Sequence, residues 1–221
     1  SSQPGIFTNL AALSFATSGG VFQVSSYINT QLGGTVDLSS CSLRLYGQGT
    51  HTGAITIGAA YYLEVAYTSL SGYKHTFSSS VTFPSGVLSE VRVTGIADIV
   101  MATFPKLVID GLYGTANLNQ NGMSLNIVQI TPSGNERPKL QGSASTITVD
   151  TLQATATSSY SCSSSSTSYA QVLIQGITTI EVTSSLSMRA DACHSTVDVI
   201  GTRINSRASG EVFMVSSSTS Y

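Results

Sequence analysis

The chain is poor in charged side chains. Asp, Glu, Lys and Arg make up 9% of its 221 residues, whereas typical soluble domains contain about 25%. The formal net charge is -2, and binding to a nucleic-acid backbone needs a row of cations that this sequence does not offer. Serine and threonine occupy the vacant places, most visibly in 158–168. The composition therefore argues against a nucleic-acid partner and favours a secreted protein kept soluble by hydroxyl groups.

Other signals are also missing. No run approaches the roughly 20 apolar residues of a membrane span, and no Asn-x-Ser/Thr sequon occurs. The first residues, Ser1–Gly5, lack the basic flank and apolar stretch of a signal peptide and resemble the start of a processed chain. With 41% hydrophobic residues, the chain can build one sizeable core. We expect a single extracellular domain, 1–221, with a Ser-rich loop at 158–168 and a tail at 216–221.

The three cysteines are Cys41, Cys162 and Cys193. None of them has the close spacing of a zinc site, so neither a metal nor a cofactor is predicted. Cys162 and Cys193 flank two strand-like runs and could form a disulfide, which would leave Cys41 buried or free. The alternative is that all three are small buried apolar residues.

Catalytic signals are weak. The histidines His51, His75 and His194 lie in unrelated contexts. Segment 191–194 joins an acid, a thiol and an imidazole, but neighbours on a strand point to opposite faces and cannot form a dyad. There is no nucleophile elbow, phosphate loop or paired carboxylate site. We predict no enzyme and no catalytic residue, and a serine hydrolase is the least favoured alternative.

Sugar binding also finds little support at this level. Aromatic platforms are the usual means of stacking on a sugar ring, and tryptophan is absent. Tyr61 and Tyr62 are adjacent, so on a strand they point to opposite faces and at most one of them could serve.

Apolar residues alternate with other residues over long stretches. From Ile55 to Tyr67 every odd position is apolar or aromatic, which predicts one long strand of roughly 40 Å at about 3.3 Å per residue. Similar runs cover 91–101 and 180–190. Turn residues separate the runs at Ser71-Gly72, Asn121-Gly122 and 132–135, and we expect an antiparallel meander. Shorter candidate strands cover 106–112, 124–130, 145–157, 170–174, 196–200 and 211–215.

One segment has helical spacing. Val21, Val24, Ile28 and Leu32 would share one face of a helix, and Gly33-Gly34 would end it. Segments 91–99 and 172–180 echo each other, but regular repetition every 20 to 50 residues, the signature of a solenoid, is not evident. The predicted fold class is mainly β (α+β), a long curved antiparallel sheet wrapped around an N-terminal helix and forming an apolar tunnel.

The order of motifs from about 53 to 192 resembles the insect takeout and juvenile-hormone-binding family, which belongs to the tubular lipid-binding proteins. A long strand leads to a turn at Leu70-Ser71-Gly72-Tyr73-Lys74. The segment Pro105-Lys106-Leu107-Val108-Ile109-Asp110-Gly111 is similar to a second family motif, and Gly142 before Thr146-Ile147-Thr148-Val149 is similar to a third. The family's N-terminal cysteine pair and its long C-terminal helix have no counterpart.

The resemblance implies a carrier for a hydrophobic small molecule such as a terpenoid, fatty acid or carotenoid. The alternation indicates which side chains would line its cavity. Every second residue from Tyr61 to Tyr67 would share one face of a strand, and so would Ile180, Val182, Leu186 and Met188. The alternative is a structural or adhesive extracellular β-protein, such as a fibre, coat or capsid subunit. The predicted ligand-binding residues are Tyr61, Leu63, Val65, Tyr67, Met101, Phe104, Ile127, Ile147, Val182, Leu186, Met188 and Phe213.

Overall fold

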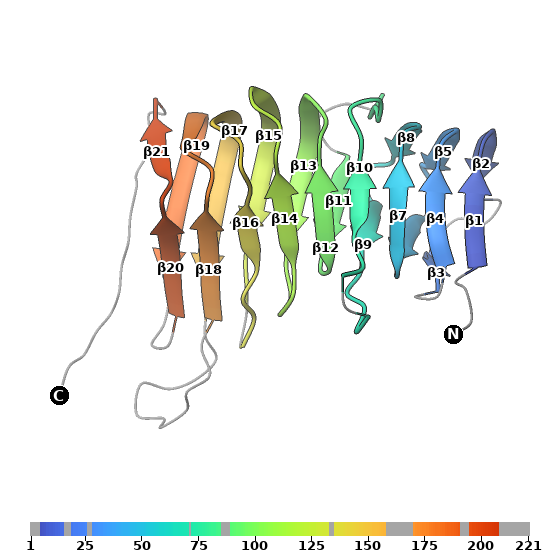
Figure 1. The fold of residues 1–221 in the computed structure, drawn as a ribbon, viewed down its shortest axis with the longest axis horizontal. Coiled ribbons are helices and arrows are strands. Elements are labelled where there is room, and N and C mark those ends of the chain that lie inside the picture. Colours follow the sequence, from blue (N-terminus) through green and yellow to red (C-terminus); the bar gives the residue numbers. More distant parts are fainter. Residues whose placement is uncertain are drawn as a thin grey trace.

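The computed structural model describes residues 5–15, 19–25, 28–70, 72–84, 89–132, 135–157, 170–190 and 195–207. Within these ranges the chain forms strands and no helix. All strand pairs between them run parallel. Consecutive strands lie in different sheets, so the chain winds in rungs that stack along one axis, as Figure 1 shows from blue to red. The fold is a parallel β-solenoid.

Three sheets make up the walls, and we name them A, B and C. Sheet A contains, in spatial order, β1 (Gly5–Asn9), β4 (Ile28–Leu32), β7 (Gln48–His51), β10 (His75–Phe77), β12 (Ile96–Ile99), β14 (Thr115–Leu118), β16 (Lys139–Gln141), β18 (Ala170–Gln175) and β20 (Ser195–Ile200). Sheet B contains β2 (Ala12–Ser14), β5 (Thr35–Leu38) and β8 (Ala54–Ile57). Sheet C contains β3 (Val21–Val24), β6 (Ser42–Leu45), β9 (Tyr62–Val65), β11 (Glu90–Val93), β13 (Thr103–Ile109), β15 (Met123–Ile130), β17 (Thr146–Ala156), β19 (Thr179–Ala190) and β21 (Arg203–Ser206).

The core consists of columns of apolar side chains that run along the axis. Parallel pairing in register places equivalent residues of successive rungs one above another, about 4.8 Å apart. On sheet C, for example, Leu63, Val91 and Leu107 occupy one inward column, and the same column continues to Leu186. These side chains are buried and belong to a single continuous apolar cluster. Residues between them point outward, which explains the alternation in the sequence.

The predicted fold class is wrong in three respects. Where an N-terminal helix was expected, Val21–Val24 and Ile28–Leu32 form strands β3 and β4. The sheets are parallel, so they are not an antiparallel meander curved around a helix. The expectation against a solenoid is also wrong. The number of residues per rung varies. Thr30 pairs with Gly49, 19 residues later, whereas Leu140 pairs with Ile174, 34 residues later. This variation hides the repeat in the sequence.

The long strand expected at 55–67 is two strands in different sheets, β8 and β9. The turn between them spans four residues, an even number, so the alternation continues across it without interruption. Candidate strands at 124–130, 145–157, 170–174 and 196–200 are confirmed to within a residue, whereas the candidate at 106–112 is a strand only as far as Ile109, where β13 ends. The candidate at 211–215, the Ser-rich loop at 158–168 and the tail at 216–221 lie outside the described residues.

Two glycines mark the corner between sheets A and B, where the backbones of successive rungs lie very close. A Cβ added to Gly34 would lie 1.9 Å from the carbonyl oxygen of Ala11, and one added to Gly53 would lie 1.8 Å from that of Gly34. Both contacts are with backbone atoms, which cannot move aside without separating the rungs. By contrast, Gly122 has a φ of +73° and open space around it.

We expect Gly53→Ala to lower the free energy of unfolding by about 3 kcal/mol, because a methyl group there forces two rungs apart. Gly122→Ala should cost only about 1 kcal/mol, the strain of a positive φ without a clash. Urea unfolding followed by circular dichroism measures both values. Equal losses in the two variants would contradict the close approach at this corner.

Candidate binding face

The outer surface of sheet A carries a ladder of polar side chains along the solenoid axis. Asp98, Asn117, Gln141 and Gln175 occupy one outward column on β12, β14, β16 and β18. Asn117 Nδ2 donates to Asp98 Oδ1 at 2.7 Å, Gln141 Nε2 to Asn117 Oδ1 at 2.9 Å, and Gln175 Nε2 to Gln141 Oε1 at 2.8 Å. The amides thus form one directed chain that ends on a carboxylate. We call these four residues the amide ladder.

Lys74 neutralises the carboxylate at the start of the ladder. Its Nζ lies 2.5 Å from Asp98 Oδ2. The neighbouring outward column adds Lys139 and Asp198, so the lysines and aspartates of these two columns balance.

A hollow of about 700 Å³ follows the ladder across several rungs. Its side is formed partly by the turns that follow the strands of sheet A. There Asn119 Oδ1 accepts hydrogen bonds from the backbone N–H and the hydroxyl of Ser143. Asn121 Oδ1 accepts a hydrogen bond from the backbone N–H of Ser145. These bonds tie each turn to the next rung and hold the edge of the hollow in place.

Two exposed tyrosines flank the opposite ends of these strands. Tyr67 and Tyr113 stack with ring centroids 4.0 Å apart and an interplanar angle of 16°. Both remain accessible, at 40% and 48% exposure. A second hollow, of about 320 Å³, lies beside Tyr67 and reaches Ile96 on the face of sheet A. A third hollow, of about 250 Å³, lies between these two. It shares Gly72 with the hollow beside Tyr67 and Lys74 with the hollow along the ladder.

A pair of histidines is buried beneath the same sheet. His51 Nε2 and His75 Nδ1 lie 2.9 Å apart, and the rings are nearly parallel. Gly49 pairs in register with His75. A Cβ there would lie 2.1 Å from the carbonyl oxygen of Thr30 and 3.1 Å from His75 Nδ1, so the glycine leaves space for this imidazole. Burial lowers the pKa of His75 to about 4. Burial, together with repulsion from His75, holds the pKa of His51 well below its ordinary value. Both rings are therefore neutral at pH 7.

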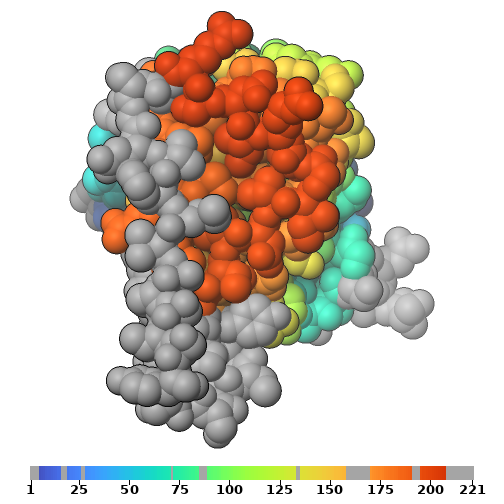
Figure 2. All heavy atoms as spheres, turned by 90° about the vertical axis from the view of Figure 1, so that its left-hand side faces the viewer, coloured from blue at the N-terminus to red at the C-terminus, as the bar shows by residue number. Residues whose placement is uncertain are grey.

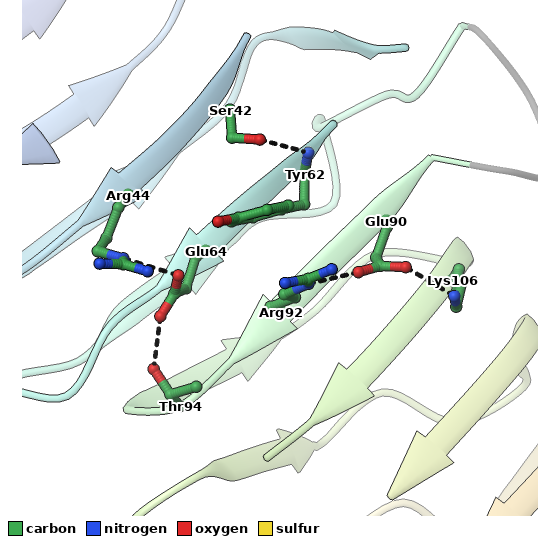
Figure 3. A network of polar contacts seen from close by, with 8 residues as sticks. All are labelled: Ser42, Arg44, Tyr62, Glu64, Glu90, Arg92, Thr94 and Lys106. Atoms are coloured by element: carbon green, nitrogen blue, oxygen red, sulfur yellow. Dashed lines mark hydrogen bonds and ion pairs between the residues drawn. The ribbon is translucent and has the colours of Figure 1, made fainter. Parts of the chain in front are cut away.

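The outer face of sheet C carries a network of ion pairs (Figure 3). Arg44 Nε lies 2.7 Å from Glu64 Oε2, and Thr94 donates to the other oxygen of Glu64 at 3.0 Å. Glu90 contacts both Arg92, at 2.5 Å, and Lys106, at 2.6 Å. Burial opposes ionisation of Glu90, but the hydrogen bonds from Lys106 and Arg92 outweigh it and hold the pKa of the carboxyl below its ordinary value. The pairs Arg44–Glu64 and Glu90–Lys106 each connect residues on two neighbouring strands of sheet C. The network therefore joins successive rungs.

Most of the predicted ligand-binding residues point into the core. Those buried there, in contact with other apolar side chains, are Leu63, Val65, Met101, Phe104, Ile147, Val182, Leu186 and Met188. Tyr61 is partly buried against the core. Ile127 points outward from sheet C, and Tyr67 belongs to the exposed pair. The structure thus brings the apolar residues together as a packed interior, and their role as a ligand wall stays a prediction.

Several sequence predictions fall on residues that are not described. These are Phe213, the pairing of Cys162 with Cys193, and the segment 191–194. Cys41 is a free, buried cysteine. Within the described ranges, no group of three or more His, Cys, Asp or Glu side chains could hold a metal ion, and no helix is long and apolar enough to span a membrane.

Comparisons with protein-family models, with curated proteins and with solved structures find no match for this chain. The fold implied by the resemblance to the takeout family is not the one that the chain adopts.

We expect the free energy of unfolding to fall by about 3 kcal/mol between pH 7.5 and pH 4, through His75 alone. The folded pKa of about 4 lies below the ordinary value of 6.5, so the unfolded chain binds the proton first. The stabilisation is complete above pH 6.5 and is lost as the pH falls toward 4. Urea unfolding at several pH values measures the slope.

The double variant His51→Leu/His75→Leu is the matched comparison, since it keeps His194 and every carboxyl group. Its stability should change less than that of the wild type between pH 6.5 and 4.5. A profile as steep as that of the wild type would contradict the assignment of this slope to the buried pair.

Proposed function

We propose that the chain is a structural or adhesive extracellular module, a rod of stacked rungs that associates end to end through its first rung. The observation that supports this most strongly is the incomplete burial of that rung, at the blue end of Figure 1. Among the strands that the structure describes, β1, β2 and β3 are edge strands of their sheets, each paired on one side only. Unpaired parallel edges are templates for further strands.

The side chains of the first rung support the same view. Phe22 lies in the inward column of Leu43, and Val24 lies in that of Leu45. Leu43 and Leu45 are buried, whereas Phe22 is 38% exposed and Val24 only partly buried. Phe15 stacks on Phe22 with ring centroids 4.3 Å apart. Within the described residues, the core therefore ends in an aromatic surface that another rung could cover.

The opposite end of the rod, formed by the last rungs, is also incompletely covered among the described residues. Figure 2 looks along the axis onto this end, where the red and orange atoms of the C-terminal part of the described chain face the viewer. There Val199 continues the inward column of Ile174 and is 37% exposed. In the part of the chain that the structure describes, both ends of the rod therefore have parallel edge strands with which a second copy could pair.

The two rival functions have less support. A carrier needs an apolar space, and most of the predicted wall residues are packed in the core. Extraction of protein from its native source with organic solvent, followed by mass spectrometry, tests that function directly. A serine hydrolase needs an accessible base, and the two histidines that the structure describes, His51 and His75, are both buried.

The test of the proposal is the mass of the protein as a function of concentration. Wild type should form larger species as its concentration rises, measured by sedimentation velocity and light scattering. Phe22→Glu places a charge on the uncovered end and should weaken association at least tenfold, because burying an unpaired carboxylate is costly.

Ile127→Glu is the matched control, since it places the same charge on the side of the rod. It should associate as wild type does, and circular dichroism should show both variants folded. A wild type that stays monomeric over the whole range, or equal weakening in the two variants, would refute association through the first rung.

A further inference from the structure

We infer that the outer face of sheet A is a binding site for an extended, neutral glycan that lies along the amide ladder. This inference deepens the proposed adhesive role by naming the chemistry of what the rod adheres to. The ladder, its hydrogen-bonding capacity, its balanced charge and the flanking tyrosines each support it.

The hydrogen-bonding capacity of the ladder fits hydroxyl groups. A side-chain amide has two N–H donors and an oxygen with two lone pairs. The bond from Gln141 to Asn117 uses one donor of the first residue and one lone pair of the second. Each ladder amide thus has further donor and acceptor capacity beside its ladder bonds. A hydroxyl group donates and accepts at once, so neighbouring hydroxyls of a sugar match such pairs.

The spacing of the ladder fits a linear polymer. Asn117, Gln141 and Gln175 repeat with the separation of adjacent strands, about 4.8 Å, which is close to the length of one sugar residue in an extended chain. The ladder bonds fix the side chains in this repeat before any ligand binds, which lowers the entropy cost of binding. The hollow follows the same direction across the rungs.

The charges of the face favour a neutral ligand. Asp98 is paired with Lys74, and Lys139 is balanced by Asp198 in the adjoining column. An acidic polymer or a nucleic acid would need an excess of cations, which these columns do not offer. A polymer of uncharged hydroxyl groups meets no repulsion there.

The stacked tyrosines add an apolar surface at the side of the ladder. Ile96 and Asp98 lie two residues apart on β12, about 7 Å along the strand, and the hollow beside Tyr67 reaches Ile96. The outward faces of aromatic rings such as Tyr113 pack against the C–H groups of a sugar ring. One edge of a bound chain would contact the tyrosines while its hydroxyls contact the amides.

A glycan array of neutral and acidic oligosaccharides tests the inference, followed by calorimetry with the best neutral ligand. Wild type should bind neutral oligosaccharides, with higher affinity for a hexasaccharide than for the corresponding disaccharide, because a longer chain contacts more rungs. Asn117→Ala/Gln141→Ala should weaken binding roughly tenfold or more, and Tyr113→Ala should also weaken it.

Gln129→Ala/Gln153→Ala is the matched control. It removes two outward side-chain amides that are in register on sheet C, on the other side of the rod. Its affinity should equal that of wild type. All measurements are repeated with Phe22→Glu as background, so that loss of end-to-end association and loss of glycan binding are separate results.

Three results would overturn the inference. One is the absence of binding to any neutral oligosaccharide at millimolar concentration. Another is equal weakening in the ladder variant and in the sheet C control. The third is a change of self-association in Asn117→Ala/Gln141→Ala without glycan binding, which would make the face an interface between copies of the chain.

Discussion

The parallel register between successive rungs is the constraint on which the rest of the structure depends. Each strand obtains its backbone hydrogen bonds from the rungs above and below. Register also sorts the side chains, since it places Leu63 over Leu43 inside the rod and Gln141 over Asn117 outside it. A slip of one residue would exchange these two environments. The apolar columns, the amide ladder and the ion-pair network are therefore consequences of one pairing pattern.

Much of the strand content could be predicted from the sequence, because burial of one face imposes a period of two. The buried residues Ile180, Val182, Leu186 and Met188 of β19 show this directly, and in β17 the period changes phase at the register shift between Val149 and Thr151. Strand direction could not be predicted, since alternation is the same in parallel and antiparallel sheets. Val21 to Leu32 shows a further limit. Two short strands, β3 and β4, place apolar residues at spacings that also fit one face of a helix.

The candidate binding face was harder to predict than the strands. The ladder residues Asp98, Asn117, Gln141 and Gln175 are far apart in the sequence at unequal separations, because the turns between rungs differ in length. One signal was present: each is a polar residue that follows a buried apolar one and precedes an apolar residue or glycine, as in Ala97-Asp98-Ile99 and Ile174-Gln175-Gly176. Sugar binding seemed unsupported because Tyr61 and Tyr62 are neighbours, whereas the accessible pair is Tyr67 with Tyr113 from a distant turn.

The direction of the backbone hydrogen bonds has a mechanical consequence. They lie along the axis of the rod, because they join one rung to the next. Tension applied between the two ends therefore loads the bonds of successive rungs in series, and the rungs can detach one at a time. Each detached rung releases a stretch of chain several times longer than the 4.8 Å that it occupied, roughly 3.4 Å for every residue. Under load such a rod lengthens in steps, which dissipates force before an attachment at either end is broken.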